Sequence, residues 1–145
     1  MATDVVLGQG AYREALDGNP QAPIWLQPWW LDATCGPKLW DALTVKEGPT
    51  ARGALAWRMS KSRGIPVLAQ APLSLGGGPW VEPHEMMLVK WQAFETGVLQ
   101  QIAGAIPDRA IYQQNWLPGR DNWLPLHWRG FRQTTRYTYR LDMAQ

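Results

Sequence analysis

The sequence predicts an α+β domain with a mixed, mainly antiparallel sheet and helices packed on it. Residues 39–71 contain three strand-like runs in succession, separated by turns at 47–50 and 61–64. Residues 85–106 carry the longest helical pattern, and residues 110–141 then alternate strand, helix and strand. A run of strands followed by helix-separated strands is typical of an α+β sheet.

The chain divides into a weakly patterned N-terminal segment, residues 1–23, and a domain spanning residues 24–145. Within the first segment, residues 5–7 suit a short strand and residues 11–17 a helical turn, which the DGNP sequence ends. The whole chain has 145 residues, 46% hydrophobic and 18% charged. That length and composition suit one domain with a buried core.

The elements of the second segment follow from local signals. Pro28 suits the first turn of a helix over 27–34, which Gly36 and Pro37 stop. Alternation over 39–46 predicts a half-buried strand, 51–60 a second strand in a hairpin with it, and 65–71 a short apolar strand in the centre of the sheet. Residues 71–83, with three consecutive glycines, predict an irregular loop.

Two further helices and two strands complete the prediction. Apolar residues recur every three to four positions over 85–106, with Glu85 as an acid in the first turn and Pro107 after the end. A short strand is expected at 110–114. A helix over 122–129 should end at Gly130 in a left-handed conformation. Residues 133–141 predict a terminal strand. One of its faces carries Thr, Tyr and Leu, and the other carries Thr and Arg.

Charge and cysteine content exclude several classes of protein. The formal net charge of +2, without a block of like charges, is too small to indicate DNA binding. No apolar run approaches the roughly 18 residues of a membrane helix, so we expect no membrane span. The single Cys35 cannot form an internal disulfide, and the N-terminus lacks signal-peptide features. These features predict a cytoplasmic protein.

Three segments carry a resemblance to a known family. IWLQPWWLDATCG, APLSLGGGPW and NWLPLHWRGFRQTTRYTYRL occur in this order. Together with the order of elements, they resemble the N-terminal half of FemAB-like acyltransferases, which consist of two GNAT-like halves in tandem. The resemblance covers residues 24–142. It implies a single GNAT-like domain that takes part in transferring an acyl or aminoacyl group to an amine.

The resemblance also has a consequence for the donor. Family members carry a second half that holds much of the donor site, so this chain resembles an acceptor-side half that needs a second GNAT-like half or a second copy. Acyl-CoA or aminoacyl-tRNA would be the donor of the complete enzyme. The alternative is a non-catalytic binding or assembly module on the same fold. In the absence of a second half, the surface that would face it is exposed. The ten tryptophans and the modest net charge therefore predict self-association through this surface.

The glycine loop departs from the phosphate-binding loop of GNAT enzymes, which runs directly into a helix. Pro79 and Pro83 lack N–H groups and separate Gly76–Gly78 from the following helix. We therefore expect a structural or substrate-facing loop, in which glycine lets the backbone pass close to another group.

The predicted substrate site takes a sugar, peptide or other small-molecule amine. Its expected residues are Gly77, Gly78, Trp80, Trp123, Trp128, Arg136 and Tyr139. Aromatic rings can stack on such a substrate and arginine can bind a phosphate or carboxylate. The structural alternatives are packing of the last helix on the sheet for the aromatic residues, and a solvated strand face for the arginines.

His127 is the candidate for a general base, and the alternative is a structural or exposed histidine. No carboxylate partner is evident at a defined spacing from it. Two histidines and one cysteine without metal-type spacing predict no metal site.

Overall fold

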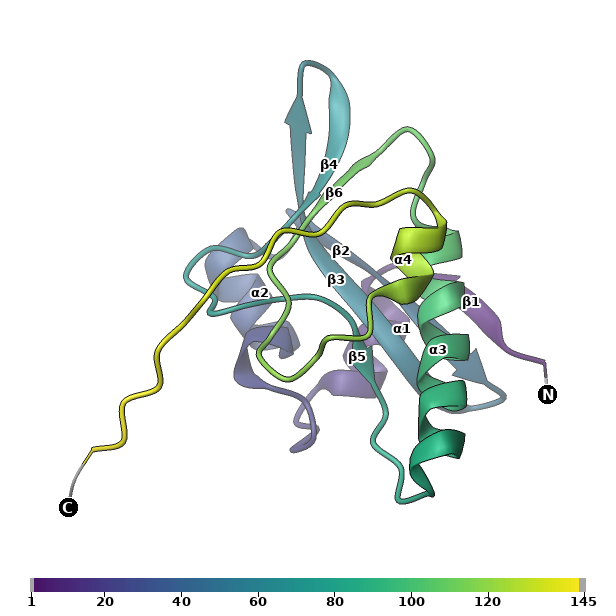
Figure 1. Cartoon of the computed structure of the whole chain (residues 1–145). Coiled ribbons are helices and arrows are strands. Elements are labelled where there is room, and N and C mark those ends of the chain that lie inside the picture. Colours follow the sequence, from purple (N-terminus) through teal and green to yellow (C-terminus); the bar gives the residue numbers. More distant parts are fainter. Residues whose placement is uncertain (1, 144–145) are drawn as a thin grey trace.

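The computed structural model describes residues 2–143 and shows an α+β fold with helices on both faces of one sheet (Figure 1). The elements in chain order are β1 (Asp4–Leu7), α1 (Gln9–Leu16), the 3-10 turn η1 (Ile24–Leu26), α2 (Pro28–Cys35), β2 (Trp40–Glu47), β3 (Thr50–Ser62), β4 (Ile65–Ala69), β5 (Trp80–Val81), α3 (Leu88–Ala105), β6 (Ile111–Gln113) and α4 (Leu124–Trp128).

The strands form a mostly antiparallel sheet in the order β1-β2-β3-β4-β6. Among the strands of residues 2–143, β4 and β6 form the one parallel pair, and α3 provides the crossover between them. The long strand β3 has two partners on the same side: its first half pairs with β5 and its second half with β4. A gap in the sheet therefore lies beside β3, between β5 and β4. The loops after β4 and β6 fill this gap.

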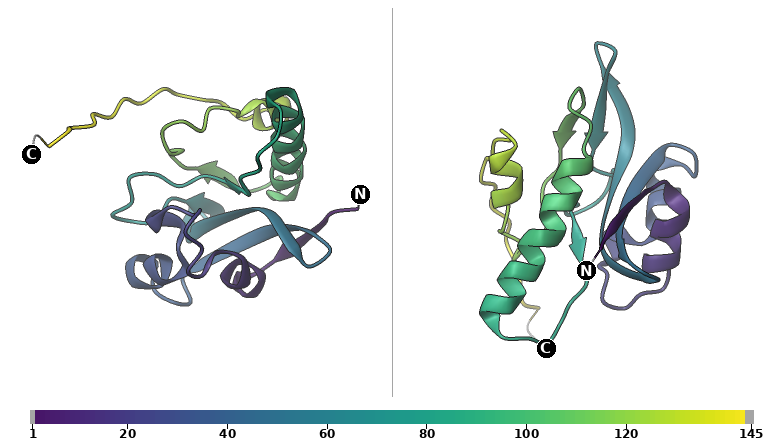
Figure 2. Two further views of the ribbon diagram at one scale, coloured as in Figure 1. Left: turned by 90° about the horizontal axis from the view of Figure 1, so that it is seen from below. Right: turned by 90° about the vertical axis from the view of Figure 1, so that its right-hand side faces the viewer.

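Two hydrophobic cores lie on opposite faces of the sheet, as the views in Figure 2 show. Helices α1 and α2 cover one face, where Tyr12, Leu31 and Trp40 are buried. Helix α3 covers the other, with Leu99 and Ile102. Because both faces are covered, β2 is buried on both sides along most of its length, so the prediction of a half-buried strand was wrong.

Several predicted elements are confirmed. The structure contains the strand and helix of the N-terminal segment, the helix that begins at Pro28, the β2–β3 hairpin and the short strands β4 and β6. The predicted central position of the third strand was wrong, because β4 lies next to the edge strand β6 and is partly exposed. Helix α4 ends as expected, since Gly130 has a φ of 88°. The Phe131 N–H donates to Leu126 O (3.1 Å), which folds the chain back after the helix.

Two predictions about the long helix and its approach were wrong. Helix α3 begins at Leu88, so Glu85 lies outside it and no acid occupies its first turn. Residues 80–81 form the strand β5 within the predicted irregular loop. Trp80 and Val81 pair with the sheet as a strand. The residues after them must then cross from the sheet to the helix layer (Figure 2), so α3 begins later than predicted.

The predicted terminal strand at 133–141 does not form. These residues are extended and exposed, without a hydrogen-bonded neighbour among the described residues. In Figure 1 this segment crosses the front of the molecule from α4 and then leaves it. A strand requires a neighbouring strand at about 4.8 Å, and β6 is separated from this segment by a groove.

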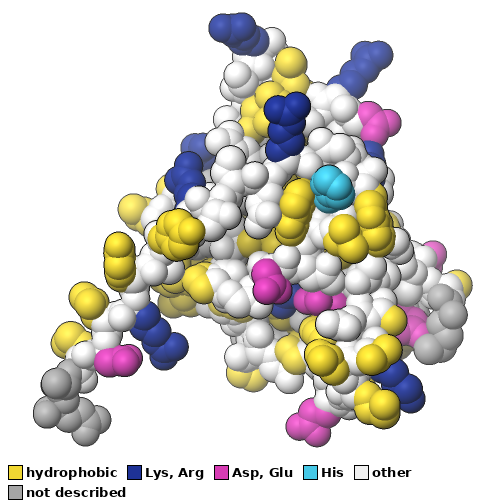
Figure 3. All heavy atoms as spheres, viewed as in Figure 1, with side chains coloured by type: hydrophobic (Ala, Val, Ile, Leu, Met, Phe, Trp, Pro, Cys, Tyr) yellow, Lys and Arg dark blue, Asp and Glu magenta, His cyan; other side chains and the backbone are white. Residues whose placement is uncertain are grey.

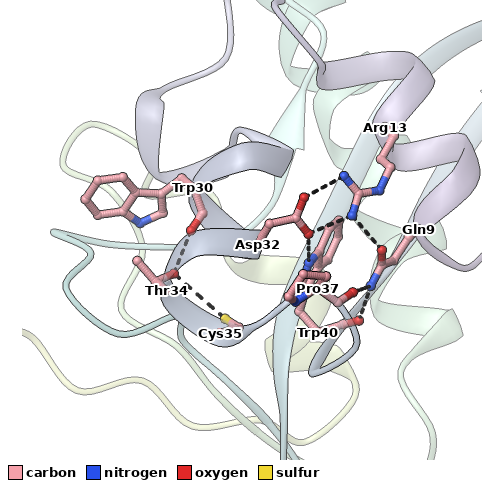
Figure 4. A network of polar contacts seen from close by, with 8 residues as sticks. All are labelled: Gln9, Arg13, Trp30, Asp32, Thr34, Cys35, Pro37 and Trp40. Atoms are coloured by element: carbon pink, nitrogen blue, oxygen red, sulfur yellow. Dashed lines mark hydrogen bonds and ion pairs between the residues drawn. The ribbon is translucent and has the colours of Figure 1, made fainter.

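A polar network fastens α1 to α2 and β2 (Figure 4). Arg13 donates to both carboxylate oxygens of Asp32, at 2.7 and 2.9 Å. Trp40 Nε1 also donates to Asp32 (2.9 Å). Gln9 Nε2 donates to the carbonyls of Pro37 (2.9 Å) and Trp40 (2.8 Å). These polar side chains form their hydrogen bonds within the protein, so we assign this cluster a structural role.

Replacing Asp32 with asparagine should destabilise the fold in a pH-dependent manner. The hydrogen-bonded Arg13 guanidinium holds the pKa of Asp32 below its usual value. A lowered folded-state pKa stabilises the fold above the unfolded pKa, near 3.9, and this contribution is lost as the pH falls through the folded pKa. The pair is partly exposed, so we expect a loss of only about 1 kcal/mol at pH 7.

Urea unfolding of the wild type and Asp32→Asn between pH 7 and pH 3 measures this effect. The difference between the two proteins should shrink below about pH 4. Arg13→Gln removes the same pair from the other side and should show the same trend. A difference that stays constant to pH 3 would assign the loss to something other than the ion pair.

Candidate functional site

A groove of about 370 Å³ lies beyond the carboxyl ends of the parallel strands β4 and β6. This is where ligands bind in open sheets with parallel strands. The lining residues come from the end of β6 and the following loop, from α4 and from the start of the C-terminal segment: Tyr112 to Asp121, Trp123, Leu126 and Phe131 to Arg136.

Gln114 organises the back of the groove, directly after β6. Its Nε2 donates to the carbonyls of Ala56 (2.8 Å) and Ala69 (3.2 Å). Its Oε1 accepts from the Gly78 N–H (2.9 Å) and the Tyr112 hydroxyl (3.1 Å). One side chain thus connects β3, β4, the glycine loop and β6 at the point where the sheet separates.

Gln70 makes a second connection between the loops after β4 and β6. Its Oε1 accepts from the Asn115 N–H (2.9 Å), and its Nε2 donates to Ser74 O (3.0 Å). Because both loops are held by side-chain amides, the groove is pre-formed.

The glycine loop passes against the loop after β6. The Gly77 N–H donates to Asn115 O (2.7 Å) and the Gly78 N–H to Gln114. Gly78 has a φ of 87°, and a Cβ there would lie 2.6 Å from the Trp116 ring. The expected close approach of the backbone is therefore confirmed. Both amides donate hydrogen bonds within the protein. In the chain, β5 lies between this loop and α3, so the loop does not run directly into a helix.

The aromatic wall of the groove is held in place by hydrogen bonds. Trp116 Nε1 donates to the Tyr112 hydroxyl (2.9 Å), which in turn donates to Gln114. Burial raises the pKa of Tyr112, so its hydroxyl keeps its proton at neutral pH. Trp123 contacts the His127 ring edge-on, at 5.2 Å between centroids. A planar ligand could stack on these fixed rings.

The charged lining of the groove is mostly basic. Arg120 pairs with Glu95 on α3 (2.9 Å), and its partial burial lowers its pKa. Within residues 2–143, neither Arg132 nor Arg136 forms an ion pair. Asp121 is the one carboxylate in the described lining. The groove therefore favours a ligand with a carboxylate or phosphate.

The structure brings some predicted site residues together and separates others. Trp123 and Arg136 line the groove, and Gly77 and Gly78 form hydrogen bonds with its back wall. Trp80 is buried in the core beneath α1 and α2, far from this role. Three predicted site residues are exposed and lie outside the groove, namely Trp128, Tyr139 and His127. The His127 ring makes no hydrogen bond within residues 2–143.

Sequence analysis missed the residues that shape the groove, namely Gln70, Tyr112, Gln114 and Arg120. Only the amide-rich run at 113–115, directly after a predicted strand, could have indicated them. Its importance depends on three distant segments that no local pattern connects.

A second polar cluster joins the segment after β5 to the β2–β3 hairpin. Arg52 pairs with Glu47 (2.7 Å) and Glu82 (2.6 Å), and His84 Nε2 lies 3.0 Å from Glu82. The hydrogen bonds to Glu82 and Glu47 raise the pKa of Arg52. His84 also packs edge-on against Phe94 of α3. These contacts position the connection to α3, which is a structural role.

Residues 2–143 contain no group of His, Cys, Asp and Glu side chains suited to hold a metal ion. Among the same residues, no helix combines the length and hydropathy needed to cross a bilayer. Comparison of the chain with protein-family models, curated proteins and solved structures found no match.

Proposed function

We propose that this chain is the acceptor-side half of an N-acyltransferase. The groove beyond β4 and β6 would bind an amine substrate, and a second, donor-binding half would supply the acyl or aminoacyl donor. In such a reaction the amine nitrogen attacks the acyl carbonyl, a base takes the proton of the amine, and the thiolate or ribose oxygen of the donor leaves.

The observation that carries the proposal is the pre-formed groove at the carboxyl ends of a parallel strand pair. Its fixed aromatic rings and arginines suit a sugar or peptide that also bears an anionic group. The order of elements, with α3 crossing from β4 to β6 and α4 ending at Gly130 and Phe131, supports a GNAT-like domain.

One observation favours a second function, that of a non-catalytic binding module. The amides of Gly77 and Gly78 are engaged within the protein. A phosphate-binding loop requires free N–H groups at a helix N-terminus, and α3 begins only at Leu88. The chain taken alone thus supplies an acceptor groove and no phosphate cradle at this loop.

Titration calorimetry with acetyl-CoA tests the donor side. We expect no saturable heat from the folded chain alone. Saturable binding would overturn the acceptor-half proposal and make this domain a donor-binding enzyme. Mass spectrometry of mixtures that also contain a donor-binding partner half distinguishes the two functions, since only the half-enzyme then yields the acylated amine.

Tryptophan fluorescence tests the acceptor groove, with glucosamine 6-phosphate and a lysine-containing acidic tripeptide as probes. We expect one of them to quench the emission, and Trp123→Ala to weaken its binding about tenfold, or 1.4 kcal/mol. Trp128→Ala is the matched control because this residue of α4 is exposed outside the groove. Equal effects of both substitutions, or no quenching by either probe, would contradict the proposed site.

A further inference from the structure

Strand β6 leaves one edge of the sheet open. It pairs with β4 on one side, and its other side has no strand partner within residues 2–143. The unpaired N–H and C=O groups of an edge strand can accept an additional strand.

An unpaired segment with strand-forming sequence lies near this edge. Residues 132–143 are extended, and their backbone makes no hydrogen bond among the described residues. Tyr137, Tyr139 and Leu141 share one face of the alternating pattern and are 88%, 91% and 86% exposed. Figure 3 shows these hydrophobic side chains as a yellow row along the segment, outside the body of the molecule. Such exposed apolar side chains indicate an interaction site.

The groove lies between the edge strand and this segment. Tyr112 and Gln113 of β6 and residues 132–136 line the same cavity. A single extended chain placed between them could form hydrogen bonds with both, one ladder on each of its sides.

We infer that this space receives residues 133–141 of a second copy of the chain, and that the exchange is reciprocal. The resulting strand order is β6, the segment of the second copy, the segment of the first copy, then β6 of the second copy. The arrangement closes with twofold symmetry and leaves no unpaired edge between the two sheets. The inserted strand takes the part of the groove next to β6, and an amine substrate would bind in the remaining part in front of Trp123.

The chain's own segment is the occupant that the described residues favour. It is strand-forming by sequence, already extended, and carries apolar side chains that nothing covers. Each copy supplies one such segment and one open edge, so two copies satisfy both without another partner.

Charge determines the register in which the two segments pair. A twofold axis perpendicular to the sheet places one residue opposite its own counterpart. With Tyr137 on the axis, Arg132 lies opposite Asp142, and Arg136 and Arg140 each lie opposite a threonine. A register centred one residue later places Arg136 opposite Arg140, and like charges that face each other are destabilising. The Tyr137 register therefore has the better charge pairing over the whole run from 132 to 142.

Cysteine crosslinking tests this register directly. In a Cys35→Ser background, Tyr137→Cys should form a disulfide-linked dimer under mild oxidation, because opposite residues of antiparallel strands are about 4.5–5.5 Å apart at Cα. Thr138→Cys is the matched control, one residue away, and should crosslink at least tenfold more slowly. Equal crosslinking at both positions would indicate random collision and overturn the inference.

Light scattering of the wild-type chain gives the second readout, with an expected mass of twice the chain. Proline at both Thr135 and Tyr137 removes the N–H groups of the ladder and should yield a monomer. Far-UV circular dichroism of this variant should lose only the strand signal of the segment and otherwise match the wild type, since the segment lies outside the core. A monomeric wild type at several hundred micromolar, or a dimer that survives the prolines, would overturn the inference. None of these measurements involves a substrate, so their outcome is independent of the proposed acyltransferase function.

Discussion

Gly53→Ala is expected to lower the free energy of unfolding by about 1–3 kcal/mol, the usual cost of overpacking a core. Gly53 is buried in β3, beneath the point where α3 crosses the sheet. A Cβ at this position would lie 2.3 Å from Val98 Cγ1 and 3.1 Å from Trp80 O. Val98 is β-branched and Trp80 O is backbone, so neither can move away easily. The helix would have to shift off the sheet.

Urea denaturation measures this loss, and a double-mutant cycle identifies its cause. Val98→Ala removes the methyl group nearest to the added Cβ, so the double variant should be more stable than the sum of the two losses predicts, by about 1 kcal/mol. Gly97→Ala is the control on α3, with nothing within 4 Å of the new Cβ. It should raise stability by about 0.5–1 kcal/mol. Additive losses in the cycle would refute the proposed clash.

Gln114→Met should lower the free energy of unfolding by about 2–4 kcal/mol. The substitution deletes four hydrogen bonds at the gap in the sheet between β4 and β5. Methionine has a similar length but cannot replace the donor or the acceptor. The partly buried carbonyls of Ala56 and Ala69 and the amide of Gly78 would lose their side-chain partner, at about 1 kcal/mol for each hydrogen bond.

The neighbouring Gln113→Met is the matched control. Gln113 is exposed on β6, and such a surface substitution should change stability by less than about 0.5 kcal/mol. Hydrogen exchange of the Gly77 and Gly78 amides gives a local readout, which should accelerate in Gln114→Met alone. Equal stability of the two variants would show that Gln114 does not hold the loops together.

Local patterns predicted most of the individual elements. Proline at the start of α2, the turn between β2 and β3 and the apolar repeat of α3 act through residues close in sequence. Gly130 is the clearest case, since a left-handed residue at a helix end favours glycine regardless of the rest of the fold. The α+β class followed from the order of these elements.

Other features depended on which segments become neighbours. Trp80 looked like a groove residue beside three glycines, but pairing of β5 with β3 places it in the core. Of the ten tryptophans, only Trp40 and Trp80 are fully buried.

The strand-forming chemistry of residues 133–141 is a property of the sequence alone, because β-branched and aromatic side chains favour an extended backbone wherever they lie. Whether that backbone becomes a strand is decided by the tertiary structure, since a strand requires hydrogen-bonding groups beside it. Here a groove separates the segment from β6. The same distinction applies to Gln114: its donor and acceptor are evident from its identity, whereas its role comes from the folding of β3, β4 and the glycine loop around one side chain.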